Sequence, residues 1–367
     1  MTTTSNPDAP FPPSHDVVDN VMLLSTLPNL RTPHFLIPVI DHAAKSARKR
    51  LIIVLFSRHF NVQYSQKDPL KKEYLTFPEI SSLSRTASWD AVQRLLTFIY
   101  VQATKVAYGL NNVLMEIDVL LKGFNEDVDP NIGNSMDICF RVTGDSIATP
   151  LPESVKLLRQ AYLRPGEREM EPTMSSIGTP NLSGHTLPPT YPVTALGGTF
   201  DHLHSGHKIL LSMGAYITSK KLIVGMTDDV LLQNKSNKHI LQSFPVRKEN
   251  VRKFLNMFKP DIIADIVPID DVYGPTGWDP DVQALVVSKE TVGGAEAIEK
   301  HRAEKNLPPL QPFLIDVISA TSASLDHEDV NFLKEHKLGS SYIRQWIVDN
   351  NKQVEKEEAR LKEETTS

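Results

Sequence analysis

Short apolar runs alternate with helical stretches along the second half of the chain, and this alternation restricts the possible folds most. Strand-type runs lie at 192–196, 221–227, 262–269, 282–288 and 313–318. Helical periodicity follows these runs. One helix ends at about Thr218, the next begins at Pro245, and further helices are predicted at 292–305, near 326–336 and at 341–350. Strand–helix alternation at this spacing predicts an α/β fold with a doubly wound parallel sheet, of the Rossmann-like kind, in which ligands bind beyond the carboxyl ends of the strands.

The first half of the chain shows a shorter version of the same alternation. Strand-type runs lie at 21–24, 51–56, 113–121 and 136–142, and helical stretches lie at 33–50, 88–110 and 153–163. The pattern predicts a smaller α/β domain over 21–163. It contains no Gly-rich phosphate loop, paired carboxylates or nucleophile motif, so binding of protein partners and a purely structural role both remain open for it.

Composition marks the segments around these two domains. Residues 1–20 are rich in Pro, Thr and Asp and predict a disordered tail, and residues 164–191 carry five prolines among Gly, Ser and Thr, as in a linker. Residues 352–367 carry mixed charge and predict a charged tail. The remaining segment, 192–351, is the second domain, and we expect it to fold and act without the first.

Charge and composition exclude several partners. The 39 basic and 44 acidic side chains give a formal charge of -5, which provides no general attraction to nucleic acid or to an anionic membrane. No apolar run approaches the roughly 18 residues of a membrane span. The single cysteine, Cys139, fits a reducing compartment, and the first residues lack the features of a leader peptide. We therefore expect a cytoplasmic protein, with the nucleus as a second candidate location, that binds neither nucleic acid nor membranes.

The residues with the clearest chemistry follow the first strand of the second domain, in the segment GGTFDHLHSGHK at 197–208. Two glycines allow a ligand to approach the backbone, and the helix that begins near Gly206 presents free N–H groups that suit phosphate. His204 and His207 are three residues apart and can face such an anion from one side. Thr199 and Ser205 add hydroxyl donors. This pattern predicts a phosphate site.

The run His204-Ser205-Gly206-His207 resembles the H-x-G-H signature of the nucleotidyltransferase superfamily, in which it binds the nucleotide triphosphate. Further motifs resemble the eukaryotic, fungal-type phosphopantetheine adenylyltransferase family, and the resemblance spans 192 to about 350. They are DDVLLQNK (228–235), DVYGPTGWDPD (271–281), VVSKETVGGAEAI (286–298) and LGSSYIR (338–344).

This resemblance implies roles for individual residues. The catalytic residues would be His204, His207 and Lys235. ATP would be bound by Gly198, Thr199, Phe200, His204, His207, Ser288, Glu290, Thr291, Ser340, Ser341 and Arg344. The acceptor substrate would be bound by Thr199, Asp201, Lys235 and Arg247. Gly339 departs from the family pattern, in which a serine stands at this position, so one hydroxyl donor is missing there while its N–H remains.

The resemblance also implies a reaction. The phosphate of 4′-phosphopantetheine would attack the α-phosphorus of ATP, with Mg²⁺ on the phosphates, to give dephospho-coenzyme A and pyrophosphate in coenzyme A biosynthesis. One alternative is a cytidylyltransferase of the same superfamily, although LGSSYIR lacks its RTEGIST-like closing residues. Another is a non-catalytic regulatory protein on the same fold. The chain has no Gly-Lys dipeptide, so the P-loop kinase that follows in the animal protein is not expected.

Overall fold

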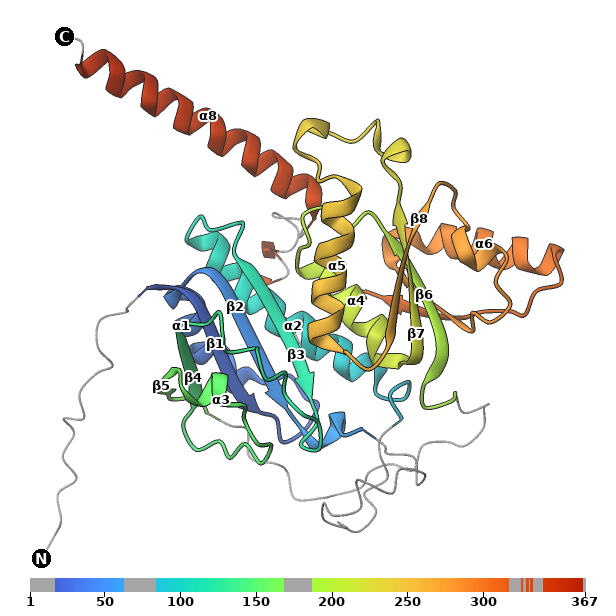
Figure 1. Cartoon of the computed structure of the whole chain (residues 1–367), viewed down its shortest axis with the longest axis horizontal. Coiled ribbons are helices and arrows are strands. Elements are labelled where there is room, and N and C mark those ends of the chain that lie inside the picture. The colour runs from blue at the N-terminus through green and yellow to red at the C-terminus, as the bar shows by residue number, and fades with distance from the viewer. Residues whose placement is uncertain are drawn as a thin grey trace, which may run out of the picture.

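The computed structural model describes residues 17–62, 84–167, 187–316 and 339–365, together with five residues between 325 and 332. Two parallel five-stranded sheets make up this part of the chain, one from each half (Figure 1). Residues 1–16 of the expected tail and most of the expected linker lie outside the described residues. The tail predicted over 1–20 is wrong at its end, because Val18–Asn20 already belong to the first strand. None of the helices in the described ranges is both long enough and apolar enough to cross a membrane.

The first sheet has the strand order β3-β2-β1-β4-β5, and its strands are parallel throughout. Its strands are β1 (Val18–Thr26), β2 (Ala47–Phe56), β3 (Glu116–Lys122), β4 (Ile138–Val142) and β5 (Arg159–Leu163). The helices of this half are α1 (Ile37–Ser46), α2 (Trp89–Gly109) and α3 (Glu153–Lys156). The central strands are buried on both faces, as their uninterrupted apolar runs predict.

The second sheet has the strand order β10-β9-β6-β7-β8 and confirms the doubly wound parallel architecture. Its strands are β6 (Tyr191–Gly198), β7 (Thr218–Thr227), β8 (Ile263–Ile269), β9 (Ala284–Ser288) and β10 (Gln311–Ile315). Its helices are α4 (Ser205–Ile217), α5 (Phe244–Phe258), α6 (Val292–Glu304) and α8 (Ser340–Thr365), the last of which projects away from the body of the molecule (Figure 1).

The two sheets share one topology. If the strands of each half are numbered from its own beginning, both sheets have the order 3-2-1-4-5. In each half, the first long helix runs into the second strand with no loop, since α1 ends at Ser46 before Ala47 and α4 ends at Ile217 before Thr218. The first two strands also show a register irregularity at the same place in both sheets. The halves are therefore two versions of one α/β unit.

Some sequence predictions need correction. The predicted helix at 153–163 is wrong in its second part, because α3 ends at Lys156 and Arg159–Leu163 pairs with β4 as an edge strand. Pairing with a neighbouring strand outweighs the local helical pattern there. The helix predicted over 33–50 ends at Ser46, and the basic residues that follow begin β2. Beyond 352 the chain is helical to Thr365, where Glu, Lys, Arg and Ala favour a helix.

The two halves are joined through a common interior. Helix α2 of the first half packs against α4 of the second, and α5 packs against β3 (Figure 1). At one end of α2, the ring centroids of Trp89 and Phe313 lie 4.8 Å apart, and the hydroxyls of Ser88 and Tyr216 lie 2.9 Å apart. Separation of the halves would expose this surface, and independent folding of the second half stays a prediction.

Candidate functional site

A tight, strained turn follows β6 and leads into α4. Phe200 and His202 have φ angles of 53° and 43°, in the left-handed region that side chains with a Cβ seldom occupy. The buried ring of Phe200 lies over Gly198, so that a Cβ at Gly198 would come within 3.0 Å of the ring. Gly198 is thus required by close packing as well as by the expected approach of a ligand.

The two histidines of the H-x-G-H run lie against each other at the start of α4. The two rings are stacked, with their centroids 3.8 Å apart and their planes at 26° to each other. The centroid of the Phe200 ring lies 5.2 Å from that of His207. The Nδ1 atom of each histidine is buried and has no hydrogen-bond partner among the described residues. The structure therefore brings His204 and His207 together as predicted, each with an unused polar atom.

Burial sets the protonation state of both rings. It lowers the pKa of His207 to about 4, against the opposing attraction of Asp201. Burial also lowers the pKa of His204 well below its ordinary value, and the neighbouring His207, Lys208 and His202 lower it further. At neutral pH both rings are therefore neutral, and each carries one N–H that can be donated. An anion bound beside them would raise both pKa values.

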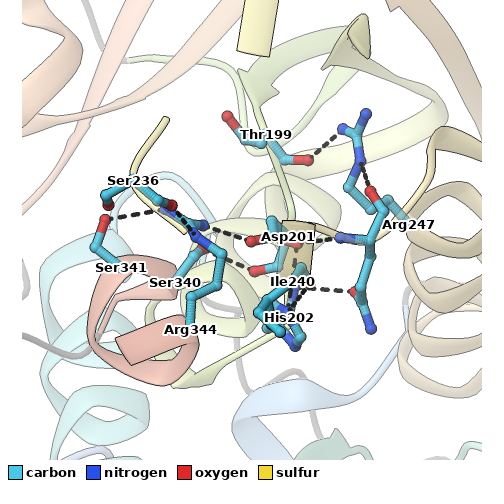
Figure 2. A network of polar contacts seen from close by, with 10 residues as sticks. Thr199, Asp201, His202, Ser236, Ile240, Arg247, Ser340, Ser341 and Arg344 are labelled. Atoms are coloured by element: carbon cyan, nitrogen blue, oxygen red, sulfur yellow. Dashed lines mark hydrogen bonds and ion pairs between the residues drawn. The ribbon is translucent and has the colours of Figure 1, made fainter. Parts of the chain in front are cut away.

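A buried ion pair fixes the position of this turn relative to α8 (Figure 2). The carboxylate of Asp201 accepts a hydrogen bond from Nη1 of Arg344 at 2.5 Å, and the hydroxyl of Ser340 donates to the Asp201 carbonyl at 2.7 Å. Arg344 also donates from Nε to the Ser236 carbonyl and from Nη2 to the Ser341 hydroxyl. Asp201 and Arg344, expected to contact substrate and ATP, thus bind each other and hold the first turn of α8 in place.

Arg247 ties together the carboxyl ends of two strands. Its buried guanidinium donates to the carbonyls of Thr199 and Thr227 at 2.7 and 3.0 Å, and to Asp229 at 2.6 Å. Its Nε donates to the carbonyl of Gln242 at 3.0 Å. Arg247 was expected to bind the acceptor, whereas the structure places its guanidinium on the ends of β6 and β7.

The residues expected after β9 form a small turn of their own. The hydroxyl of Thr291 accepts a hydrogen bond from the Ser288 N–H and donates one to the Ser288 carbonyl, both at 3.1 Å. The backbone of Glu290 lies in this turn, and its side chain lies outside the described residues. Because β9 is next to β6 in the sheet, this turn lies at the same edge as the turn after β6 that carries His202, His204 and His207, which we call the histidine turn.

Lys235 lies in the loop after β7, directly before Ser236. Its side chain is exposed, and its ammonium forms no ion pair with the described residues. It differs in this from Arg247 and Arg344, whose charges are already used by carboxylates of the protein. Lys235 is therefore a cation beside the site that remains available to a ligand.

The arrangement can hold phosphate groups at one edge of the sheet. The turn between β6 and α4 meets the first turns of α8 at the Asp201–Arg344 pair, and α6 begins after the adjacent strand β9. Helix N-termini and hydroxyls bind anions well. In the part of the chain that the structure describes, no three His, Cys, Asp or Glu side chains gather closely enough to hold a metal ion.

Sequence reasoning missed several residues of this region. Gln242 donates its N–H to Asp201 at 2.9 Å and accepts from the His202 N–H at 3.0 Å, which closes the loop after β7 onto the histidine turn. Asp118 in β3 and Lys208 in α4 form a buried ion pair between the two halves, with 2.6 Å between oxygen and nitrogen. Asp118 and Lys208 are charged residues within apolar runs, and this signal could have identified both.

Comparisons with known proteins agree with this geometry. The family model described as cytidylyltransferase-like matches residues 195–345. A phosphopantetheine adenylyltransferase of Saccharomyces cerevisiae is 51% identical over 126 residues, or 34% of this chain and 41% of the relative. An uncharacterized protein of Schizosaccharomyces pombe is 42% identical over 42% of this chain and 47% of its own length. The matches thus span less than half the length of these two fungal relatives.

An archaeal relative is matched over most of its length. The phosphopantetheine adenylyltransferase of Pyrobaculum aerophilum is 34% identical over 149 residues, which make up 41% of this chain and 87% of the relative. Together with the doubly wound sheet and the histidine pair at the start of α4, this match shows that the chain belongs to the phosphopantetheine adenylyltransferase family of the nucleotidyltransferase superfamily.

Proposed function

We propose that this protein transfers the adenylyl group of ATP to 4′-phosphopantetheine, which gives dephospho-coenzyme A and pyrophosphate in coenzyme A biosynthesis. The observation that carries the proposal is the histidine pair: two neutral imidazoles, each with a buried and unpartnered Nδ1, at the N-terminus of α4. The names of the fungal and archaeal relatives support the choice of substrates.

The chemistry proposed for the site is electrostatic. The attacking phosphate is already an anion, so the reaction needs no strong general base, and its main difficulty is the approach of two polyanions. His204 and His207 would donate to the α-phosphate, and the exposed ammonium of Lys235 would lie between the two reacting phosphates. Preorganised donors of this kind stabilise the charge of the transition state.

Mg²⁺ fits this site as an ion carried by ATP. The carboxylates nearest the histidine turn, Asp201 and Asp229, are occupied by Arg344 and Arg247 and so are poor metal ligands here. Phosphate oxygens of ATP would therefore supply most of the coordination. When bound, the ion would neutralise phosphate charge during transfer.

The test is pyrophosphate release by the full-length protein with ATP or CTP and 4′-phosphopantetheine, with the product identified by mass spectrometry. We expect turnover with ATP, little with CTP, and dephospho-coenzyme A as the final product. Equal or faster turnover with CTP would contradict the adenylyl assignment. Absence of turnover with both ATP and CTP would contradict the proposed reaction itself.

A pair of lysine variants tests the proposed contact with both substrates. Lys235→Ala should lower kcat and raise KM for 4′-phosphopantetheine while the melting temperature stays the same, because the side chain is exposed. Lys238→Ala is the matched control, since Lys238 lies in the same loop and contacts Gln233. Similar kinetics for the two variants would remove Lys235 from the mechanism.

A further inference from the structure

The shared topology allows the two halves to be compared residue by residue. Val18 pairs with Ala47 where Tyr191 pairs with Thr218, and each pair joins a first strand to the residue that directly follows a helix. Counted along the strands from these pairs, Ser25 and Thr26 at the end of β1 correspond to Gly198, the last residue of β6, and to Thr199 directly after it. Counted back from the ends of the helices, Pro33 and Leu36 take the places of His204 and His207.

In the first half, the position that corresponds to the phosphate site is occupied by a carboxylate of the chain itself. Asp145 accepts hydrogen bonds from the N–H of Thr26 at 2.7 Å and from the hydroxyl of Ser25 at 2.9 Å. β4 pairs with β1 as β9 pairs with β6. Counted from these pairings, Asp145 of the first half corresponds to Thr291 of the second half. A negative charge at this position, without either histidine, repels a phosphate group.

The first half instead holds the first turn of α4 through three buried polar contacts, one of which joins the Lys208 ammonium to the Ile117 carbonyl at 2.8 Å. The hydroxyl of Thr104 in α2 lies 2.8 Å from that of Ser205, the residue between His204 and Gly206. The ammonium of Lys208, the residue after His207, donates to Asp118 at 2.6 Å. Ser205 lies within the H-x-G-H run, and Lys208 directly follows it.

The environment of the Asp118 carboxylate keeps it ionised, so that it can bind the Lys208 ammonium. Besides Lys208, it accepts two hydrogen bonds from Arg50 of β2, at 2.8 and 3.0 Å. Burial would raise the pKa of Asp118, but Lys208 and Arg50 together hold that pKa below its ordinary value. The carboxylate therefore stays ionised and keeps Lys208 in place.

These contacts matter because apolar packing is incomplete at this point. A cavity of about 760 Å³ lies between the halves beside the first turn of α4, and Thr104, Asp118, His204 and Lys208 are among its lining residues. On the side of this cavity, the first turn of α4 contacts the first half through these polar partners.

We propose that the N-terminal half is a catalytically silent copy of the same fold, which serves to position the H-x-G-H turn of the second half through Thr104 and Asp118. This proposal rests on the proposed function for its kinetic test. Thr104 and Asp118 are positioning residues, because they act on the histidines through Ser205 and Lys208 and do not touch substrate. The N-terminal half itself binds no nucleotide.

The first experiment compares Thr104→Val with Thr104→Ser in the full chain. The valine variant removes the hydroxyl partner of Ser205 and should lower kcat on the order of 10-fold, with KM for ATP changed much less, because small misplacements of catalytic groups reduce turnover strongly. The serine variant should restore kcat. A purely structural role predicts a lower melting temperature with normal kcat in both variants and would overturn the proposal.

The second experiment removes the charge of Asp118. Asp118→Asn should lower kcat more than Thr104→Val does, on the order of 10²-fold. The matched control is Asp19→Asn in the same sheet, where an exposed carboxylate also pairs with two cations, Arg48 and Lys49. Equal kinetics for both Asp→Asn variants would overturn the positioning role of Asp118. If Asp118→Asn does not fold, the Thr104 pair still decides.

Two measurements separate this proposal from the proposed function. The imidazole NMR resonances of His204 and His207 should shift in Thr104→Val and stay in place in Asp19→Asn, whether or not the wild-type protein turns over 4′-phosphopantetheine. Unshifted resonances in both would overturn the proposal. Calorimetric titration with Mg²⁺·ATP should give one site per chain, and two sites would show that the N-terminal half is not silent.

Discussion

The two sheets of this protein show that one fold can carry two different sets of residues at the same edge. Both have the same strand order, the same direct passage from helix to strand and the same register irregularity. They differ in the loop after the first strand, where one half has Gly198 and two histidines and the other has Ser25 with Pro33 and Leu36. The common topology supplies an edge where strands and helices begin and end, and the loop residues set the chemistry of that edge.

The two loops are also held by charges of opposite kinds. In the second half, the buried cations Arg247 and Arg344 fix backbone carbonyls and Asp201. In the first half, the carboxylate of Asp145 holds backbone and hydroxyl donors. Cations that hold carbonyls leave N–H groups available to an anion, whereas a carboxylate uses them up.

The largest effect should follow from loss of the buried ion pair of the second half. Arg344→Met leaves the Asp201 carboxylate buried without its partner, which typically costs about 3–5 kcal/mol of folding free energy. Asp19→Asn removes a surface ion pair of the first half and should cost much less, because solvent screens such a pair. Urea unfolding of both variants measures the difference. Equal losses would show that burial does not distinguish the two pairs.

The histidines of the two loops should differ strongly in turnover. His207→Ala should lower kcat on the order of 10²–10³-fold, because it removes one preorganised donor. His34→Ala changes the exposed histidine of the N-terminal loop and should leave kcat as it is. The stacking of His207 on His204 also means that its removal costs some stability, so kcat and melting temperature are to be measured on one preparation.

Acid should weaken the protein partly through the histidine turn. The pKa of His207 is about 4 in the folded protein and about 6.5 when unfolded, so the unfolded chain binds the extra proton between these values. The stabilising contribution is complete above pH 6.5 and is lost as the pH falls towards 4, by up to roughly 3 kcal/mol. His207→Ala should flatten the dependence of unfolding free energy on pH. An unchanged slope, equal to that of His34→Ala, would contradict the buried neutral ring.

The smallest effect concerns the corresponding positions Gly198 and Ser25. Gly198→Ser gives the loop of the second half the residue of the first half and forces the Phe200 ring to move, at about 1–3 kcal/mol for an overpacked position. We expect lower kcat as well, because Phe200 lies against His207. Ser25→Gly removes the hydroxyl that contacts Asp145 and the Thr26 carbonyl, and it should leave kcat unchanged. Turnover by Gly198→Ser at the wild-type rate would show that the loop does not need a glycine here.

The sequence alone was enough for the sheet of the second half and for the grouping of its two histidines at the start of α4. Buried parallel strands have uninterrupted apolar runs, and a helix start with Gly-Gly and two histidines is a local pattern, so both can be read from neighbouring residues. The predicted grouping of His204 and His207 depends only on the helical spacing of three residues. Such features depend only on residues that are close in sequence, so they can be predicted without knowledge of the tertiary contacts.

Tertiary structure decided which of the predicted side chains remain available to ligands. Asp201, Arg247 and Arg344 are the right residue types for binding phosphate or substrate, but they reach one another or backbone carbonyls after folding. The edge strand Arg159–Leu163 and the contact between Asp118 and Lys208 likewise depend on partners far away in the chain. A buried charge must find a counter-charge wherever the fold places one, and no local pattern of residues states which partner that will be.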